Sequence, residues 1–128
     1  MPRRTTDPTE HPREAAEAVR AFNHATQHPH RGIAYPGTAY HAISAFATLA
    51  HRLPQSYEQI GAALTALHTA GHLTADHGTP TTHTTAVVTA LHEAAKHATA
   101  MAAALERAHS AASPLGYCGP TDDTDDDL

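Results

Sequence analysis

The sequence predicts an all-α fold, in which an antiparallel hairpin of two long helices follows a short helix and pairs with a second copy into a four-helix bundle. Two observations predict the hairpin. Larger apolar residues recur at alternating spacings of three and four along two stretches, which is a heptad pattern. A short polar stretch with glycines separates them, as expected for a turn between antiparallel helices. A third observation, a nonpolar face wider than one partner helix can cover, predicts the second copy.

The N-terminal part is predicted to contain a disordered segment and a short helix. Residues 1–11 carry Pro, Thr and charged residues without periodicity, as in disordered segments. Pro12 suits the first turn of a helix over residues 12–26, because the N–H that proline lacks has no partner there anyway. The apolar residues of this helix fall on one stripe: Ala15, Ala18, Val19, Phe22 and Ala25. Prolines and glycines then break the pattern before Thr38, a suitable N-cap for the next helix.

The first arm of the hairpin is predicted over residues 39–72. Its repeating positions keep their phase through Pro54 without a skip: they are Ile43, Phe46, Ala50, Leu53, Tyr57, Ile60, Leu64 and Leu67. Proline removes its own N–H and crowds the carbonyl of Ala50, so a bend is expected. Because a separately oriented helix would have no reason to keep the phase, we expect one helix kinked at Pro54.

The second arm is predicted over residues 81–112, after a turn that contains two glycines and Pro80. Its repeating positions are again spaced four and three: they are Val87, Leu91, Ala94, Ala98, Met101, Leu105, Ala108 and Ala112. The register that sets Ile60 opposite Leu91 pairs large residues with small ones in most layers. A shift of seven residues would alternate overpacked layers with cavities, each costing about 1–3 kcal/mol.

The positions that flank this predicted seam are those that a second chain would contact. None of them is Lys, Arg, Asp or Glu, although two-stranded coiled coils usually carry charges there. We therefore predict a homodimer interface at six flanking residues: Leu49, Pro54, Ala63, Val88, Ala95 and Ala102. A helix of another protein is a further candidate partner for this face. The alternative is a monomer with an Ala-rich surface.

Charge and hydropathy argue against two classes of partner. The chain has eight Lys and Arg and 13 Asp and Glu, and five of the acidic residues lie in the terminal TDDTDDDL. The rest of the chain therefore has no net charge and few basic residues, which makes binding to nucleic-acid phosphates unfavourable. Residues 113–128 are predicted to form a flexible acidic tail. No uncharged apolar run approaches the roughly 18 residues of a membrane helix, and no signal peptide is recognisable. With a single cysteine, Cys118, we expect a cytoplasmic protein that does not bind membranes.

Histidine, at 13 of 128 residues, suggests an alternative function. His68 and His72 are four residues apart on the predicted helix, and His77 follows in the turn; imidazoles at this spacing suit Zn, Ni or Cu. No Cys or acidic residue completes the pattern. The histidines could equally make a pH-responsive binding module, since His97 and His109 flank the predicted seam.

Catalysis is not predicted. The sequence shows no paired carboxylates in an apolar setting, no glycine loop before a helix, and no Ser or Cys near a positioned base. We therefore expect a non-enzymatic interaction protein without a cofactor, and keep a His-mediated metal-binding or pH-responsive module as the alternative.

Three stretches carry a resemblance to a known group. HRLPQSYEQIGAAL, the turn HTAGHLTADHG and the closing MAAALERAHSAASPLG resemble short helical proteins of high-GC actinobacteria, of unknown function, that carry an LPQ-type segment. The resemblance covers residues 38–115. It implies a turn followed by an Ala-rich second helix, and it brings no catalytic residues.

Overall fold

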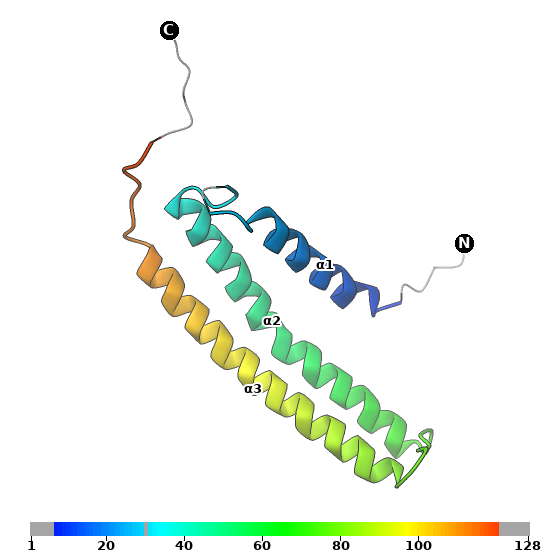
Figure 1. The fold of residues 1–128 in the computed structure, drawn as a ribbon. Coiled ribbons are helices and arrows are strands. Elements are labelled where there is room, and N and C mark those ends of the chain that lie inside the picture. Colours follow the sequence, from blue (N-terminus) through cyan, green and yellow to red (C-terminus); the bar gives the residue numbers. More distant parts are fainter. Residues whose placement is uncertain (1–6, 30, 121–128) are drawn as a thin grey trace, which may run out of the picture.

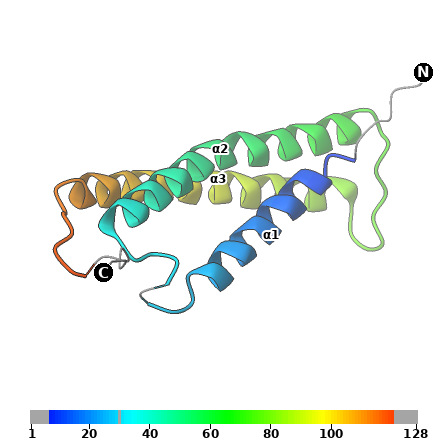
Figure 2. The ribbon, with the colours of Figure 1, turned by 90° about the horizontal axis from the view of Figure 1, so that it is seen from above.

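The computed structural model describes residues 7–29 and 31–120 of the chain. This part contains three α-helices and no strand: α1 (Glu10–Ala25), α2 (Pro36–Thr69) and α3 (Pro80–Ala112). α2 and α3 lie side by side and antiparallel, and α1 lies on the side of α2 away from α3 (Figure 1). Viewed from above, α1 also leaves the plane of the hairpin (Figure 2). The predicted all-α hairpin with a short preceding helix is confirmed, and the four-helix bundle stays a prediction.

α1 begins at Glu10, two residues before the predicted Pro12, and a turn at Asp7 precedes it. Its Oδ1 accepts hydrogen bonds from the backbone N–H and the hydroxyl of Thr9, at 3.0 and 2.9 Å. The N–H of Glu10 donates to the carbonyl of Asp7 at 3.1 Å. A carboxylate that accepts from the N–H two residues later forms an Asx-type turn, and this turn precedes Thr9, the N-cap of α1. The helical part therefore begins within the predicted disordered segment, whose residues 1–6 lie outside the described part, as do residues 121–128 of the predicted acidic tail.

The connection between α1 and α2 folds back on the end of α1. Gly32 has φ +77°, and the N–H of Ile33 donates to the carbonyl of Arg31 at 2.8 Å, which is the pattern of a γ-turn. A Cβ atom on Gly32 would collide with the backbone carbonyl of Ala25. Both the backbone angle and the close approach therefore require glycine at this position.

α2 is one helix that runs through Pro54, as predicted. It begins at Pro36 rather than at residue 39, and its N-cap is Tyr35 rather than Thr38. The sequence pattern treated Pro36 as a helix breaker. Proline instead suits the first helical position, where its fixed φ is already helical and its missing N–H costs no hydrogen bond.

The C-terminal end of α2 is a glycine-based cap. Gly71 has φ +76° and its N–H donates to the carbonyl of His68 at 3.0 Å, while the N–H of His72 donates to the carbonyl of Leu67 at 3.0 Å. This pair of bonds is a Schellman motif. The helix ends at Thr69, three residues before its predicted end.

α3 begins one residue before its prediction. Thr79 is the N-cap, and its side chain accepts a hydrogen bond from the N–H of Thr82 at 3.1 Å. Pro80 follows in the first turn. No helix in the described part of the chain is long and apolar enough to cross a membrane.

The seam between α2 and α3 is built from small residues. The buried positions are all alanine or glycine: Ala47, Ala50, Gly61, Ala95, Ala98 and Ala102. Partly buried residues continue the spacing of three and four in both helices. In α2 these are Tyr40, Ile43, Pro54, Tyr57, Leu64 and His68, and in α3 they are Thr84, Val88, Leu91, Leu105, His109 and Ala112.

Half of the predicted seam is therefore wrong by one residue. Positions such as Ile43, Ala50 and Leu91 lie in the seam as expected. The remaining predicted positions do not, and the residue that follows each of them takes its place. At several of these sites the replacement is smaller, as Gly61 is for Ile60 and Ala102 is for Met101. Small side chains let two helices approach closely, so that many atoms gain van der Waals contact. Large side chains at the buried positions 47, 61, 95 and 102 would hold the helices apart.

The predicted register is confirmed to within two residues. A Cβ built on Gly61 would lie 3.8 Å from both Val88 and Leu91, and the predicted register places position 90 opposite Gly61. At the far end of the hairpin, the ring of Tyr40 stacks on His109 with centroids 3.9 Å apart and planes 22° apart. The alternative register, shifted by seven residues, is excluded.

Candidate interaction surface

The hairpin has two long edges, one on each side of the seam between α2 and α3. His51 follows the seam residue Ala50, and Glu106 follows the seam residue Leu105. The His51 Nε2 lies 3.0 Å from the Glu106 Oε2, so these two following positions share one edge. In an antiparallel helix pair, the residues that precede the other set of seam positions must then share the opposite edge.

The edge that contains His51 is polar. Its residues are Ser44, His51, Glu58 and Thr65 from α2, and Thr85, His92, Thr99 and Glu106 from α3. A hollow of about 430 Å³ lies on this edge, beside Gly61 and between Glu58 and His92. The contact between His51 and Glu106 is half exposed, with side-chain exposures of 55% each. Pairs of this kind contribute about 0.2–1 kcal/mol, so the edge is a solvated surface.

The opposite edge is apolar. Its residues are Phe46, Leu53, Ile60 and Leu67 from α2, and Val87, Ala94, Met101 and Ala108 from α3. Four of these are exposed by 40–50%: Ile60, Leu67, Val87 and Met101. Large apolar side chains that gather at one exposed edge mark interaction surfaces more often than scattered ones do. We call Leu53, Ile60, Leu67, Val87, Ala94 and Met101 the open face.

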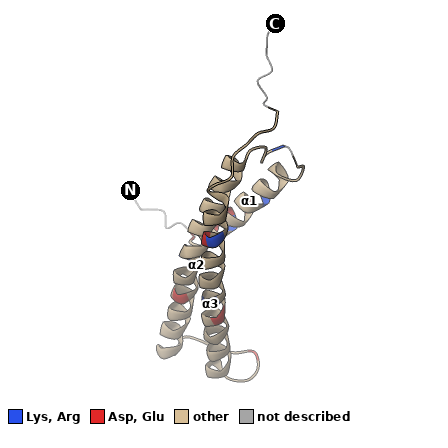
Figure 3. Ribbon diagram, turned by 90° about the vertical axis from the view of Figure 1, so that its left-hand side faces the viewer, with Lys and Arg blue, Asp and Glu red and all other residues tan. Residues whose placement is uncertain are grey.

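Charged residues avoid the open face. Acidic and basic residues are sparse along α2 and α3 (Figure 3). Those in the two helices are Arg52, Glu58, Glu93, Lys96, Glu106 and Arg107. At helical spacing they all fall on the polar edge or the outer surface. The open face would therefore neither repel an identical surface nor attract a charged one.

α1 covers one end of the apolar edge. The ring of Phe22 meets the ring of Phe46 edge-on, with centroids 5.1 Å apart and planes at 77°. A groove of about 270 Å³ remains between the two helices, which we call the α1–α2 groove. Its lining is apolar: Ala15, Ala18, Val19, Phe22, Ala42, Ala45, Phe46 and Leu49. Among the described helices, no Cα of α1 lies within 8 Å of a Cα in α2 or α3, so α1 packs far less closely than they do.

The six predicted interface residues divide between the seam and the surface. Four lie in the seam: Pro54, Val88, Ala95 and Ala102. Ala95 and Ala102 are buried within one chain, with exposures of 7% and 1%, so they are not available to a second chain. This corrects the prediction, and the cause is the displaced seam. Leu49 lines the α1–α2 groove, and Ala63 is exposed on α2.

The sequence pattern placed the residues of the open face inside the hairpin. The signal that identifies the true seam is the run of small residues at the same spacing, such as Ala47 and Gly61 in α2 and Ala95 and Ala102 in α3. A seam of small residues necessarily turns the adjacent large ones outward.

The three predicted metal ligands are not brought together. α2 ends before His72, so His72 and His68 do not share a helical face. The His68 Nε2 lies 3.1 Å from the hydroxyl of Thr81, whereas His77 offers its backbone carbonyl to the His83 Nε2 at 2.7 Å. No three His, Cys, Asp or Glu side chains of the described residues are grouped so that they could hold a metal ion.

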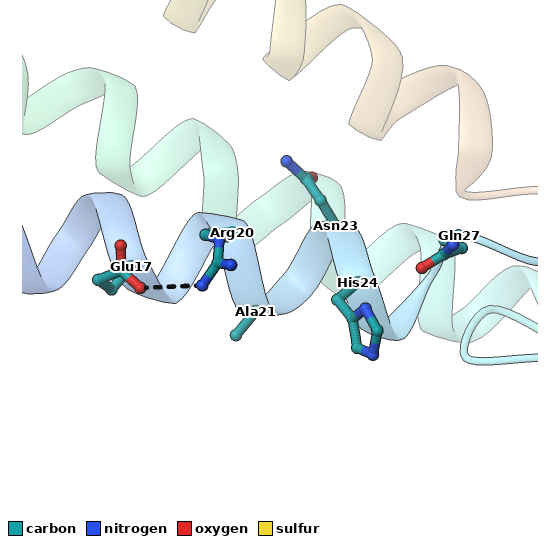
Figure 4. A pocket seen from close by; sticks show the side chains of 6 residues that line it. All are labelled: Glu17, Arg20, Ala21, Asn23, His24 and Gln27. Atoms are coloured by element: carbon teal, nitrogen blue, oxygen red, sulfur yellow. Dashed lines mark hydrogen bonds and ion pairs between the residues drawn. The ribbon is translucent and has the colours of Figure 1, made fainter.

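Another hollow, of about 670 Å³, lies along the outer side of α1. Its lining residues are Glu17, Arg20, Ala21, Asn23, His24 and Gln27, all exposed. Asn23 points to one side of the helix, and Ala21 and His24 point to the other (Figure 4). The Glu17–Arg20 ion pair, at 3.4 Å, is exposed to solvent. Since a single helix cannot enclose a ligand, this hollow is not a binding site.

Comparison with protein-family models, with curated proteins and with solved structures gives no match. The resemblance to the actinobacterial LPQ-type proteins stays a prediction.

Proposed function

We propose that this protein is a non-enzymatic interaction protein that forms a homodimer, in which the open faces of two hairpins pack together as a four-helix bundle. The observation that carries the proposal is the open face. Ile60, Leu67, Val87 and Met101 are half exposed on one edge, and that edge carries no charge. Covering such side chains removes apolar surface from water at about 25 cal/mol per Å².

A second copy suits the open face because the side chains that α2 contributes to this face are larger than most of those that α3 contributes. α2 contributes Leu53, Ile60 and Leu67, whereas α3 contributes Val87, Ala94 and Met101. A two-fold axis parallel to the helices lays α2 of one copy over α3 of the other. The larger stripe of each copy then meets the smaller stripe of its partner, which avoids overpacking.

Sedimentation velocity over a range of protein concentrations tests the dimer. We expect the mass of the native chain to rise with concentration from 13.5 kDa towards twice that value. Ile60→Asp places a charge in the centre of the open face and should keep the chain monomeric, with unchanged helicity by circular dichroism. The matched control is Gln59→Asp, which adds the same charge at the adjacent exposed position and should leave the dimer intact.

A native chain that stays at 13.5 kDa at every concentration would contradict the homodimer. The open face would then be left for a helix of another protein, which is a different proposal. Equal effects of Ile60→Asp and Gln59→Asp would show that net charge, not the open face, controls association.

A further inference from the structure

We infer that α1 belongs to the dimer interface, where α1 of each copy closes against α3 of the partner and the α1–α2 groove is filled by that partner helix. The inference rests on the proposed homodimer and adds a second, separate contact to it. It assigns an occupant to the groove, whose apolar lining comes from α1 and α2 alone.

The size of the open face shows that it needs an extension. From Leu53 to Leu67 it is about 21 Å long, and two helices of about 10 Å diameter give it a width of about 20 Å. This amounts to on the order of 400 Å², about half of the ~800 Å² that each partner buries in a standard interface. A tight dimer therefore requires apolar surface beyond the open face.

The α1–α2 groove is the adjoining apolar surface. Phe46 lines the groove and also belongs to the apolar edge that continues into the open face. α1 contributes Ala18, Val19 and Phe22 to the groove, and none of its Cα atoms lies within 8 Å of a Cα atom of α2 or α3. None of the residues of α1 is buried, so its apolar stripe is only partly covered within one chain.

The two-fold arrangement brings a suitable segment of α3 to this groove. With α2 of one copy over α3 of the other and both turns at the same end, Phe46 lies level with residues 101–108 of the second copy, as the hairpin register requires. This segment presents Met101, Ala104 and Ala108 towards the groove. The alanines permit close approach of α1, and the thioether of Met101 suits contact with the rings of Phe22 and Phe46.

Disulfide cross-linking between differently tagged chains tests the contact. In a Cys118→Ser background, which removes the single native thiol, an Ala18→Cys chain is mixed with an Ala104→Cys chain and oxidised. We expect a covalent heterodimer. The matched control replaces Ala104→Cys with Ala103→Cys, an exposed neighbour turned to the outer surface, and should cross-link at least tenfold less.

Phe22→Ala provides an independent measurement. We expect it to weaken dimerisation at least tenfold in sedimentation while α2 and α3 keep their helicity. Equal cross-linking at positions 103 and 104, or an unchanged dimer affinity in Phe22→Ala, would overturn the inference and leave the homodimer standing. A native chain that is monomeric at every concentration would overturn both, so the two failures are distinguishable.

Discussion

Two helix contacts in this chain are built on opposite principles. Between α2 and α3, alanines and Gly61 form a buried seam in which the helices approach closely. Between α1 and α2, two phenylalanine rings meet at 5.1 Å, and an apolar groove remains beside them. The first contact buries small side chains, and the second leaves apolar side chains exposed.

The difference shows what the size of a side chain decides. Small residues allow the backbones to approach, and the fold gains dispersion contact over many atoms. The large residues of the same helices are then turned to an edge where only another element can cover them. Stability within one chain and association between chains therefore depend on different residues of one heptad pattern.

Overfilling the seam should have the largest effect. Ala102 is 1% exposed, so Ala102→Leu inserts three extra carbon atoms into a filled space and should lower the free energy of unfolding by about 1–3 kcal/mol. The matched control is Ala103→Leu, at the adjacent exposed position, which should change it by less than about 0.5 kcal/mol. Urea denaturation at one fixed protein concentration measures both. Similar midpoints for the two variants would mean that the seam is not closely packed.

Adding a methyl group at Gly61 should act in the opposite direction, because the seam has room for it there. A Cβ on Gly61 would make ordinary contacts at 3.8 Å with Val88 and Leu91. Gly61→Ala should therefore raise the free energy of unfolding by about 0.5–1 kcal/mol, because alanine loses less backbone entropy in a helix. Gly32→Ala is the contrasting variant, since φ is +77° and a Cβ would strike the carbonyl of Ala25.

In a thermal melt, the two glycine variants report on different regions: Gly61→Ala on the seam between α2 and α3, and Gly32→Ala on the turn that follows α1. Gly61→Ala should raise the melting temperature, and Gly32→Ala should lower the helicity of α1 while the hairpin transition changes little. A lower melting temperature in Gly61→Ala would show that the helices approach at this point more closely than 3.8 Å contacts allow.

The sequence was sufficient for the hairpin, because heptad phase and turn residues are local signals. The phase continues through Pro54, and the single α2 helix confirms that reading. The predicted helix ends were wrong by up to three residues at positions where proline or glycine can either interrupt a helix or form its first turn or cap. Pro36 begins a helix instead of preventing one, and Gly71 ends α2 before His72.

The location of the apolar surface required tertiary information. The sequence pattern placed Ile60 and the other open-face residues inside the hairpin, and it placed Pro54 and Ala95, which lie in the seam, on the flank. It did not show which of two neighbouring stripes turns inward, because Ile60 and Gly61 both fit a heptad position. That choice depends on how closely the two backbones approach, which is a property of the pair and not of either helix. The grouping of the histidines is tertiary information as well: His68, His72 and His77 follow one another in the sequence, yet the described structure does not gather them at one point.

The carboxylate of Asp7 should give the smallest effect, confined to the start of α1. The hydrogen bonds from the backbone N–H of Thr9 and then from its hydroxyl lower the pKa of Asp7 below its ordinary value of 3.8. A carboxyl with a lowered folded-state pKa stabilises the fold above its unfolded-state pKa and loses that contribution as the pH falls through the folded-state value. Between about pH 5 and pH 2, NMR chemical shifts should therefore report fraying of the first turn of α1 only.

Asp7→Asn is the control for this titration, because its side-chain oxygen still accepts the Thr9 hydrogen bonds but does not ionise. The first turn of this variant should not respond to Asp7 titration over the same pH range. If the first turn of α1 frays equally at low pH in both proteins, protonation of other carboxylates causes the fraying. The effect should stay local because α1 has no buried residue and packs loosely on α2, so opening its first turn leaves the alanine seam intact.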